Sequence, residues 1–318
     1  MIRLRLVPAK TNIKFLNQRL KAFYLSGFLF IGSVVLFISM GLNYGIDFEG
    51  GILIEVGTPE PTELSVMRGA LSKLDLGEVA LQEFGRATEV LVRIERQPGD
   101  STAQQRAVAE VKEALSKEVP GEISYRRVEF VGPKVSAELV RAGTLASVLA
   151  VIAMLIYIWF RFEWQFAIGA VLALVHDIVL TIGVFALTRL EFNLSIIAAI
   201  LTIVGYSVND TVVVYDRIRE NLRKYRKMPL SELLNVSIND TLSRTTMTSA
   251  TTLIALMTLF IFGGAVIKGF TFAMMWGVIV GTYSSIFIAA PLLIYAGLRR
   301  DAMDKDPKED EDSVSDIA

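Results

Sequence analysis

Apolar residues gather in six long runs along the chain, separated by polar stretches. The runs cover about residues 22–42, 140–160, 165–187, 194–215, 245–262 and 270–297. A helix needs roughly 20 residues to cross the hydrocarbon core of a bilayer, at about 1.5 Å per residue. The pattern therefore predicts a polytopic α-helical membrane protein with six transmembrane helices.

The polar interval after the first run has a different periodicity, which is typical of a small folded domain. Four strands are predicted at GILIEVG, VALQEFG, TEVLVRIER and ISYRRVEFV. Two amphipathic helices are predicted at PTELSVMRGALSKL and TAQQRAVAEVKEALSKEV. The order β-α-β-β-α-β is that of the ferredoxin-like arrangement. We therefore expect a small ferredoxin-like α+β domain over residues 43–138, inserted after the first helix.

The distribution of charge orients these elements across the membrane. Residues 1–21 are basic, and so is segment 216–243, which is predicted to be an amphipathic loop between the fourth and fifth runs. Segments that flank membrane spans on the cytoplasmic side carry an excess of Lys and Arg, so we expect both segments in the cytoplasm. Because six spans return the chain to the side where it began, we expect both termini in the cytoplasm as well. The α+β domain is then extracytoplasmic. Residues 139–298 complete the bundle with five helices, and the acidic stretch 299–318 forms a cytoplasmic tail.

Composition excludes several classes of function. Of the 318 residues 53% are hydrophobic, and a net charge of −1 gives no basic excess that would suggest nucleic-acid binding. Cysteine is absent and His176 is the only histidine, which excludes thiolate catalysis, disulfides and metal sites built from Cys or several His. The carboxylates of the α+β domain are scattered and form no catalytic constellation. We expect a protein that is not an enzyme and that uses no cofactor or metal.

A carboxylate interrupts the fourth apolar run. Asp210 lies inside the run beside Asn209. A carboxylate in hydrocarbon costs at least about 2.5 kcal/mol, so such groups face a partner or a water-filled path. At helical spacings, Ser207 and Thr211 share a face with Asp210. The fifth span carries a second polar stripe, formed by Arg244, Thr248, Thr251 and Thr252.

Asp210 and Arg244 are expected to lie at one depth near the cytoplasmic side, because the fourth span runs inward and the fifth runs outward. Burial favours a neutral carboxyl, whereas a nearby guanidinium favours the carboxylate. Movement of Arg244 relative to Asp210 would then take up or release a proton, with Asn209 and the Ser and Thr hydroxyls holding water. The alternative is a permanent Asp210–Arg244 ion pair that only fixes helix packing.

Two further groups of residues in the apolar runs need an interpretation. His176 and Asp177 lie near the middle of the third span. They are either a second proton-handling site, because His titrates near neutral pH, or a hydrogen-bonded clamp between helices. The last span carries a face of small residues, which we interpret as a surface for close helix packing. This face is formed by Gly277, Gly281, Ser284 and Ser285.

Six motifs together make the chain similar to a known family. They are DFEGG (47–51), VGPKVSAEL (131–139), VHD (175–177), VGYSVNDTVVVYDRIREN (204–221), LSRTTMTSATTL (242–253) and KGFTFAMMWGVIVGTYSSIFIAAPLL (268–293). In this order they resemble the SecD/SecF family of protein-export membrane subunits, within the resistance–nodulation–division superfamily. The resemblance is to the smaller, SecF-type subunits, and it covers the chain apart from its two tails.

The resemblance implies a membrane subunit that promotes the export of precursor proteins, driven by inward flow of H⁺, or of Na⁺ in some members. It implies SecD and the SecYEG translocon as partners, together with a YajC- or YidC-type accessory protein, the exported polypeptide and membrane lipid. It also implies the bacterial cytoplasmic membrane as the location. Asp210 and Arg244 match the positions assigned to proton transport, with a carboxylate of SecD completing the path. The alternative function is proton-coupled export of a small molecule or lipid, against which the small size of the outer domain argues.

Overall fold

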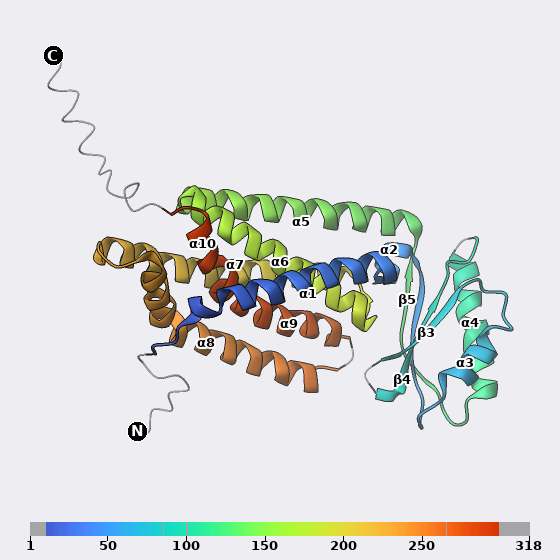
Figure 1. Ribbon diagram of the computed structural model, residues 1–318. Coiled ribbons are helices and arrows are strands. Elements are labelled where there is room, and N and C mark those ends of the chain that lie inside the picture. Colours follow the sequence, from blue (N-terminus) through green and yellow to red (C-terminus); the bar gives the residue numbers. More distant parts are fainter. Residues whose placement is uncertain (1–10, 85, 100, 265, 299–318) are drawn as a thin grey trace, which may run out of the picture.

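The computed structural model describes residues 11–84, 86–99, 101–264 and 266–298. It consists of a bundle of long helices with a small α/β domain at one end, which we call the domain end of the bundle (Figure 1). The predicted tail 299–318 lies outside the described residues, and so does the first part of the predicted basic segment 1–21.

The part of the chain that the structure describes contains six helices long and apolar enough to cross a membrane, as the apolar runs predict. Five are α1 (Arg19–Met40), α5 (Pro133–Arg161), α6 (Trp164–Thr188), α7 (Leu194–Lys224) and α8 (Leu230–Phe262). The sixth is composite: α9 (Lys268–Ser284) runs through a π-helical turn, η2 (Ser285–Ala289), into α10 (Ala290–Tyr295). The arrangement confirms the predicted fold class of a polytopic helical membrane protein.

The segment 216–243, predicted as an amphipathic loop, is mostly helical, because α7 and α8 extend through it and leave a short turn. Buried leucines and isoleucines hold the two extensions together, and polar groups join them as well. Asn221 Nδ2 donates to Ser237 Oγ at 3.0 Å, and Arg217 forms an ion pair with Asp240 at 2.7 Å. The start of the described chain packs here too, because Asn235 and Asn239 accept hydrogen bonds from the backbone N–H groups of Leu16 and Ile13.

The α/β domain has the predicted order of elements. These are β2 (Gly51–Gly57), α3 (Leu64–Leu71), β3 (Val79–Phe84), β4 (Arg86–Ile94), α4 (Ser101–Glu118) and β5 (Ser124–Val131). The strands lie in the order β3-β4-β2-β5, and every neighbouring pair is antiparallel, which is the ferredoxin-like topology. The helices α3 and α4 cover the face of the sheet that points away from the bundle (Figure 1).

The connection between the α/β domain and the bundle is built from several short contacts. The two-residue strand β1 (Asn43–Tyr44) pairs in parallel with β6 (Glu191–Phe192), which lies between α6 and α7. The short helix α2 (Ile46–Glu49) follows β1, and Asp47 Oδ2 accepts a hydrogen bond from the backbone N–H of Leu194 at 3.0 Å. The domain therefore contacts the first turn of α7 directly.

The backbone conformation of Gly51 explains why paired glycines follow α2. Its φ of +120° lies in the region that favours glycine, and a Cβ there would lie 2.6 Å from the carbonyl oxygen of Ile94. Any side chain would push β2 away from β4 at the first pair of their register. The two glycines thus end α2 and start the sheet.

Candidate functional site

The first carboxyl of the candidate site is Asp210, in the middle of α7. Its side chain is 8% exposed. Thr245 Oγ1 on α8 donates to Asp210 Oδ1 at 2.8 Å, and Ser285 Oγ donates to Asp210 Oδ2 at 2.6 Å. Three helical elements therefore meet at this carboxyl, and both hydroxyl partners are neutral groups.

The second carboxyl is Asp177 on α6, which is only 1% exposed. Its Oδ2 accepts hydrogen bonds from Ser207 Oγ at 2.6 Å and from Ser284 Oγ at 2.7 Å. Its Oδ1 lies 3.0 Å from Nδ1 of His176. The pair His176–Asp177, for which the sequence indicates no partner, thus has partners on both α7 and α9.

The two carboxyls belong to one polar centre, because their partners are neighbours in the chain. Ser284 and Ser285 are consecutive, at the point where α9 passes into the π-helical turn. Ser207 and Asp210 are three residues apart on α7 and so lie on one face. Single π-helical turns occur frequently at functional sites. A further pair of hydroxyls, those of Ser249 on α8 and Thr282 on α9, lies beside them.

Close packing of α7 against α9 brings these groups together. A Cβ at Gly277 would lie 2.2 Å from Ile203, and one at Gly281 would lie 3.1 Å from the Cβ of Ser207. Glycine at these positions lets the helices approach closely. The small-residue face of the last span therefore packs on the fourth span. Its two serines, however, bind carboxyls in addition to filling space.

Several of the predicted relay residues lie elsewhere. Asn209, Arg244 and Thr248 are exposed on the surface of the bundle. Among the described residues, no Arg or Lys forms an ion pair with Asp210, so the permanent Asp210–Arg244 pair, which was the alternative to a relay, is absent from this structure. The hydroxyl of Thr248 donates to the backbone carbonyl of Arg244 at 2.9 Å.

The reason for this difference is the rotation of α8. Arg244 and Thr248 share one side of the helix, and Thr245 and Ser249 share the side turned towards α7 and α9. Thr211 is buried beside Asp210, but within the described part of the chain its side chain makes no hydrogen bond to either carboxyl. Sequence reasoning missed Thr245, and it interpreted Ser284 and Ser285 as part of a packing face only. Their only signal as partners of a carboxyl was a hydroxyl at helical spacing from other polar residues.

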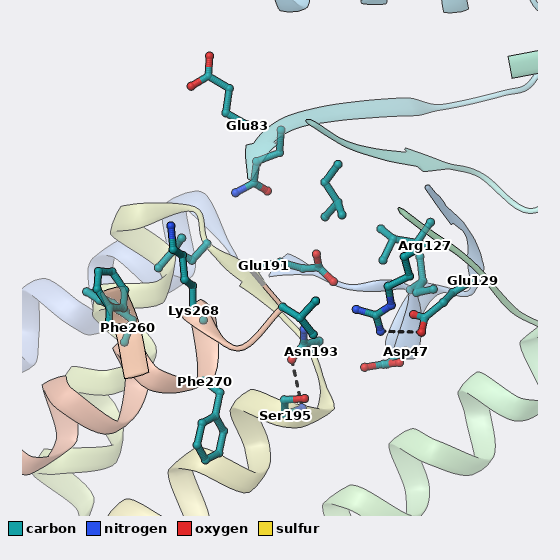
Figure 2. A pocket seen from close by; sticks show the side chains of 18 residues that line it. Asp47, Glu83, Arg127, Glu129, Glu191, Asn193, Ser195, Phe260, Lys268 and Phe270 are labelled. Atoms are coloured by element: carbon teal, nitrogen blue, oxygen red, sulfur yellow. Dashed lines mark hydrogen bonds and ion pairs between the residues drawn. The ribbon is translucent and has the colours of Figure 1, made fainter. Parts of the chain in front are cut away.

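A separate cavity of about 230 Å³, lined by both charged and apolar residues, lies between the sheet and the domain end of the helices. Figure 2 shows the carboxylates of Asp47, Glu129 and Glu191 around it, with Arg127 bound to Glu129 at 2.6 Å. Burial raises the pKa of Glu191, and the nearby carboxylate of Asp47 acts in the same direction. The cavity is not lined by any residue that binds Asp177 or Asp210. It belongs to the joint between the two parts of the molecule.

Two family models match this chain. The model described as "Protein export membrane protein SecD/SecF, C-terminal" matches residues 110–299, which include all the helices that surround the two carboxyls. The model described as "SecD/SecF GG Motif" matches residues 35–58, which include Asp47 and Gly51.

Individual relatives cover nearly the whole chain. It is 47% identical over 312 residues to the protein translocase subunit SecF of Cereibacter sphaeroides, with 96% of each chain covered. It is also 47% identical over 293 residues to the subunit of the same name from Rickettsia rickettsii, covering 91% of this chain and 94% of the relative.

Solved structures agree with these relatives. The crystal structure of SecDF from Thermus thermophilus, a translocon-associated membrane protein, matches with a TM-score of 0.83 at 33% identity. The match covers 92% of this chain but 40% of that one, so this chain spans less than half the length of that SecDF. The family indicated by the six sequence motifs is thereby confirmed, and the chain belongs to the SecD/SecF family of protein export membrane proteins.

Proposed function

We propose that this chain acts as a SecF-type subunit of the bacterial protein translocase and promotes the export of precursor proteins together with SecD and the SecYEG channel. The support is the identity of 47% to proteins named translocase subunit SecF, over nearly the full length of both chains. In this proposal the chain lies in the cytoplasmic membrane with both termini in the cytoplasm, and it is not an enzyme. The α/β domain is extracytoplasmic and faces the exported polypeptide.

The proton-motive force drives this function through Asp210, and one observation carries that part of the proposal. Asp210 is a buried carboxyl within a membrane span, and its two bonds come from the hydroxyls of Thr245 and Ser285. Hydroxyls can both donate and accept, so this environment can hold the carboxylate or the protonated acid. A fixed ion pair with an arginine would instead keep the carboxylate ionised.

Arg244 supplies the movable counter-charge. It directly precedes Thr245, the α8 residue that binds Asp210, but its own side chain is exposed. Arginine does not deprotonate in proteins, so it acts on Asp210 through its charge alone. Rotation or sliding of α8 would bring the guanidinium towards Asp210 and favour release of the proton. The reverse movement would favour proton uptake.

A partner subunit completes the site in this proposal. Asn209, Arg244 and Thr248 are exposed on helices that span the membrane, where polar side chains facing lipid are costly. The solved SecDF is much longer than this chain, and its remaining part is where we expect the covering surface and a further carboxylate. SecYEG, a YajC- or YidC-type accessory protein and lipid are the other partners. H⁺ is the expected coupling ion and Na⁺ the alternative.

Two substitutions test the function in vesicles that contain this chain with SecD and SecYEG. Asp210→Asn removes the proton-binding group, and Arg244→Met removes the counter-charge. We expect Asp210→Asn to lower precursor export and proton conduction by about a hundredfold or more, the effect of losing a positioned proton-transfer group. Arg244→Met should lower both as well. The matched control is Asp216→Asn on the same helix, whose carboxylate forms an exposed ion pair with Arg161. The control should behave as the wild type.

The outcome separates the candidate functions. Normal export and normal flux in both variants would refute the coupling through Asp210. Replacing the proton gradient by a sodium gradient identifies the coupling ion. Loss of small-molecule efflux with normal secretion would support the exporter of small molecules or lipids instead.

A further inference from the structure

Two buried carboxyls are bound by two consecutive serines. Ser284 Oγ lies 2.7 Å from Asp177 Oδ2, and Ser285 Oγ lies 2.6 Å from Asp210 Oδ2. Adjacent residues of a helix point in directions about 100° apart. The serines at the start of the π-helical turn therefore reach α6 on one side and α7 on the other. One short segment thus contacts both carboxyls.

Each of these serines has a second acceptor within reach. Ser284 Oγ is 3.1 Å from the carbonyl oxygen of Gly281, and Ser285 Oγ is 3.0 Å from that of Thr282. A serine hydroxyl has a single hydrogen, so it can donate to only one acceptor at a time. Each of the two hydroxyls can therefore donate its hydrogen either to a carboxyl or to the backbone carbonyl three residues earlier in the helix.

These two alternative hydrogen bonds allow each carboxyl to exist in both protonation states. No buried polar group loses its hydrogen bond in either state. When Asp177 is ionised, Ser284 donates to it. When Asp177 carries a proton on Oδ2, the acid donates to Ser284 Oγ and the serine hydrogen turns to Gly281. The same exchange applies to Asp210, Ser285 and Thr282. A buried donor or acceptor that loses its hydrogen bond is costly, and rotation of the hydroxyls avoids this loss.

His176 does not supply a permanent counter-charge for Asp177. Its Nδ1 lies 3.0 Å from Asp177 Oδ1, whereas its Nε2 is buried without a hydrogen-bond partner in the described structure. An imidazolium would place an N–H at Nε2 with no acceptor, so the neutral ring that donates through Nδ1 fits this site better. The other titratable group beside the ring is Tyr283, whose hydroxyl donates to the carbonyl of Ala22 at 3.0 Å.

No other described side chain neutralises Asp177. Within the residues that the structure describes, its only charged or ionisable contact is His176, and no Arg or Lys forms an ion pair with it. A carboxylate that is 1% exposed inside a membrane bundle is costly without a compensating charge. Binding a proton removes that charge and requires only the hydroxyl rotation described above.

We propose that Asp177 is a second proton-binding residue of the relay, and that Ser284 and Ser285 are positioning residues that adjust to the protonation of Asp177 and Asp210 respectively. The inference rests on the proposed function of Asp210. One proton binds the Asp177 carboxylate to form the neutral acid, and its release restores the carboxylate. The structural alternative is a fixed clamp, in which Asp177 holds α6, α7 and α9 together and never changes its protonation.

Proton conduction in vesicles with SecD is the first test. We expect Asp177→Asn to lower conduction by about a hundredfold, as for other positioned proton-transfer groups. Asp177→Glu, which keeps a proton-binding group, should restore part of it. Ser284→Ala should lower conduction by about tenfold, the rate equivalent of one net hydrogen bond. The matched control is Thr181→Val, whose buried hydroxyl donates only to the backbone carbonyl of Asp177, and it should conduct normally.

Infrared difference spectra between acid and neutral pH are the second test, because they detect protonated carboxyls without any flux. We expect a carboxyl band that persists in Asp210→Asn, is absent from Asp177→Asn and shifts in Ser284→Ala. The band should be unchanged in Thr181→Val. A fixed clamp would give no such band, whatever its effect on stability.

The results separate this inference from the proposed function. Spectra in which Asp177→Asn removes no band would overturn the role of Asp177, even if Asp210→Asn blocks conduction. Normal conduction in Asp210→Asn would instead refute the proposed coupling through Asp210, while the band still decides whether Asp177 binds a proton. If Asp177→Asn does not co-purify with SecD, Ser284→Ala replaces it, and an unshifted band then overturns the proposal.

Discussion

Glu191 lies where the α/β domain meets the bundle, outside the membrane-spanning helices. Burial is the main cause that raises its pKa above the ordinary 4.5, and Asp47 adds to it, whereas Arg93, Asn193 and Arg127 act in the opposite direction. A raised pKa in the folded state means that the folded chain binds more protons than the unfolded chain just above pH 4.5. The contribution of Glu191 to the stability of the folded chain is therefore greatest below pH 4.5 and falls as the pH rises through the folded pKa.

Substitution of Glu191 by Gln should remove this dependence on pH. The amide resembles the protonated acid, so we expect Glu191→Gln to melt at a higher temperature than the wild type at neutral pH. The difference should shrink as the pH is lowered towards 4.5. Thermal unfolding of the purified chain in detergent, over a series of pH values, measures it. Glu122→Gln at an exposed position is the matched control, and a constant difference at all pH values would contradict the prediction.

At the scale of single residues, the ionisable residues of the candidate site could be predicted from the sequence, but their hydrogen-bond partners could not. Asp210 and the pair His176–Asp177 stand out because ionisable groups are rare within apolar runs. Hydroxyls such as those of Thr245, Ser284 and Ser285 give no such signal, because Ser and Thr satisfy their hydrogen bonds within a helix and are common there. Their binding to carboxyls depends on helix rotation, which the sequence does not specify.

At the scale of secondary structure, Asp47 links two elements that are far apart in sequence. It lies on α2, and its carboxylate accepts a hydrogen bond from the backbone N–H of Leu194, in the first turn of α7. The first N–H groups of a helix have no partner within the helix, and a negative charge near them is favourable. The domain thereby acts as an additional cap on the helix that carries Asp210.

Loss of this cap should weaken the joint between the domain and the bundle. We expect Asp47→Ala to lower the free energy of unfolding by about 0.5–2 kcal/mol, as for other capping residues, whereas Asp47→Asn should lose less because it keeps an acceptor. Chemical unfolding in detergent measures the change. Glu49→Ala on the same short helix is the control, because Glu49 is half-exposed and its contact with Arg93 is long at 3.8 Å. Equal losses for Asp47→Ala and Glu49→Ala would contradict the capping role.

The positions of the membrane spans could be predicted closely from the sequence, but the helical extensions of α7 and α8 could not. Each span is a long and mostly apolar run, so its existence follows from the hydropathy pattern alone. The segment 216–243 was predicted as a loop because of its charges, yet Ile218, Leu222 and Leu234 form a buried stripe that extends both helices. The π-helical turn that begins at Ser285 was not predicted. It ends shortly before Pro291, which has no backbone N–H to donate to the carbonyl four residues earlier in the helix.

At the scale of the whole molecule, burial is uneven across the bundle. In their most apolar windows, 67% of the last span and 56% of α6 are buried, against 11% of α8 and none of α5. The outer surface of α5 is apolar and suits lipid. α8 differs, because its exposed surface also carries Arg244 and Thr248. Polar side chains at membrane depth require a partner, so α5 and α8 are expected to have different surroundings.

Cross-linking can distinguish these two surfaces directly. The sequence has no cysteine, so Thr248→Cys and Phe160→Cys each give the chain a single thiol, which can carry a benzophenone label. Phe160 on α5 is 86% exposed and apolar. When the chain is assembled with SecD in vesicles, light should link position 248 to SecD because the partner covers the polar stripe, whereas position 160 should react with lipid. Equal linkage to SecD from both positions, or none from position 248, would show that the polar stripe of α8 is not the covered surface.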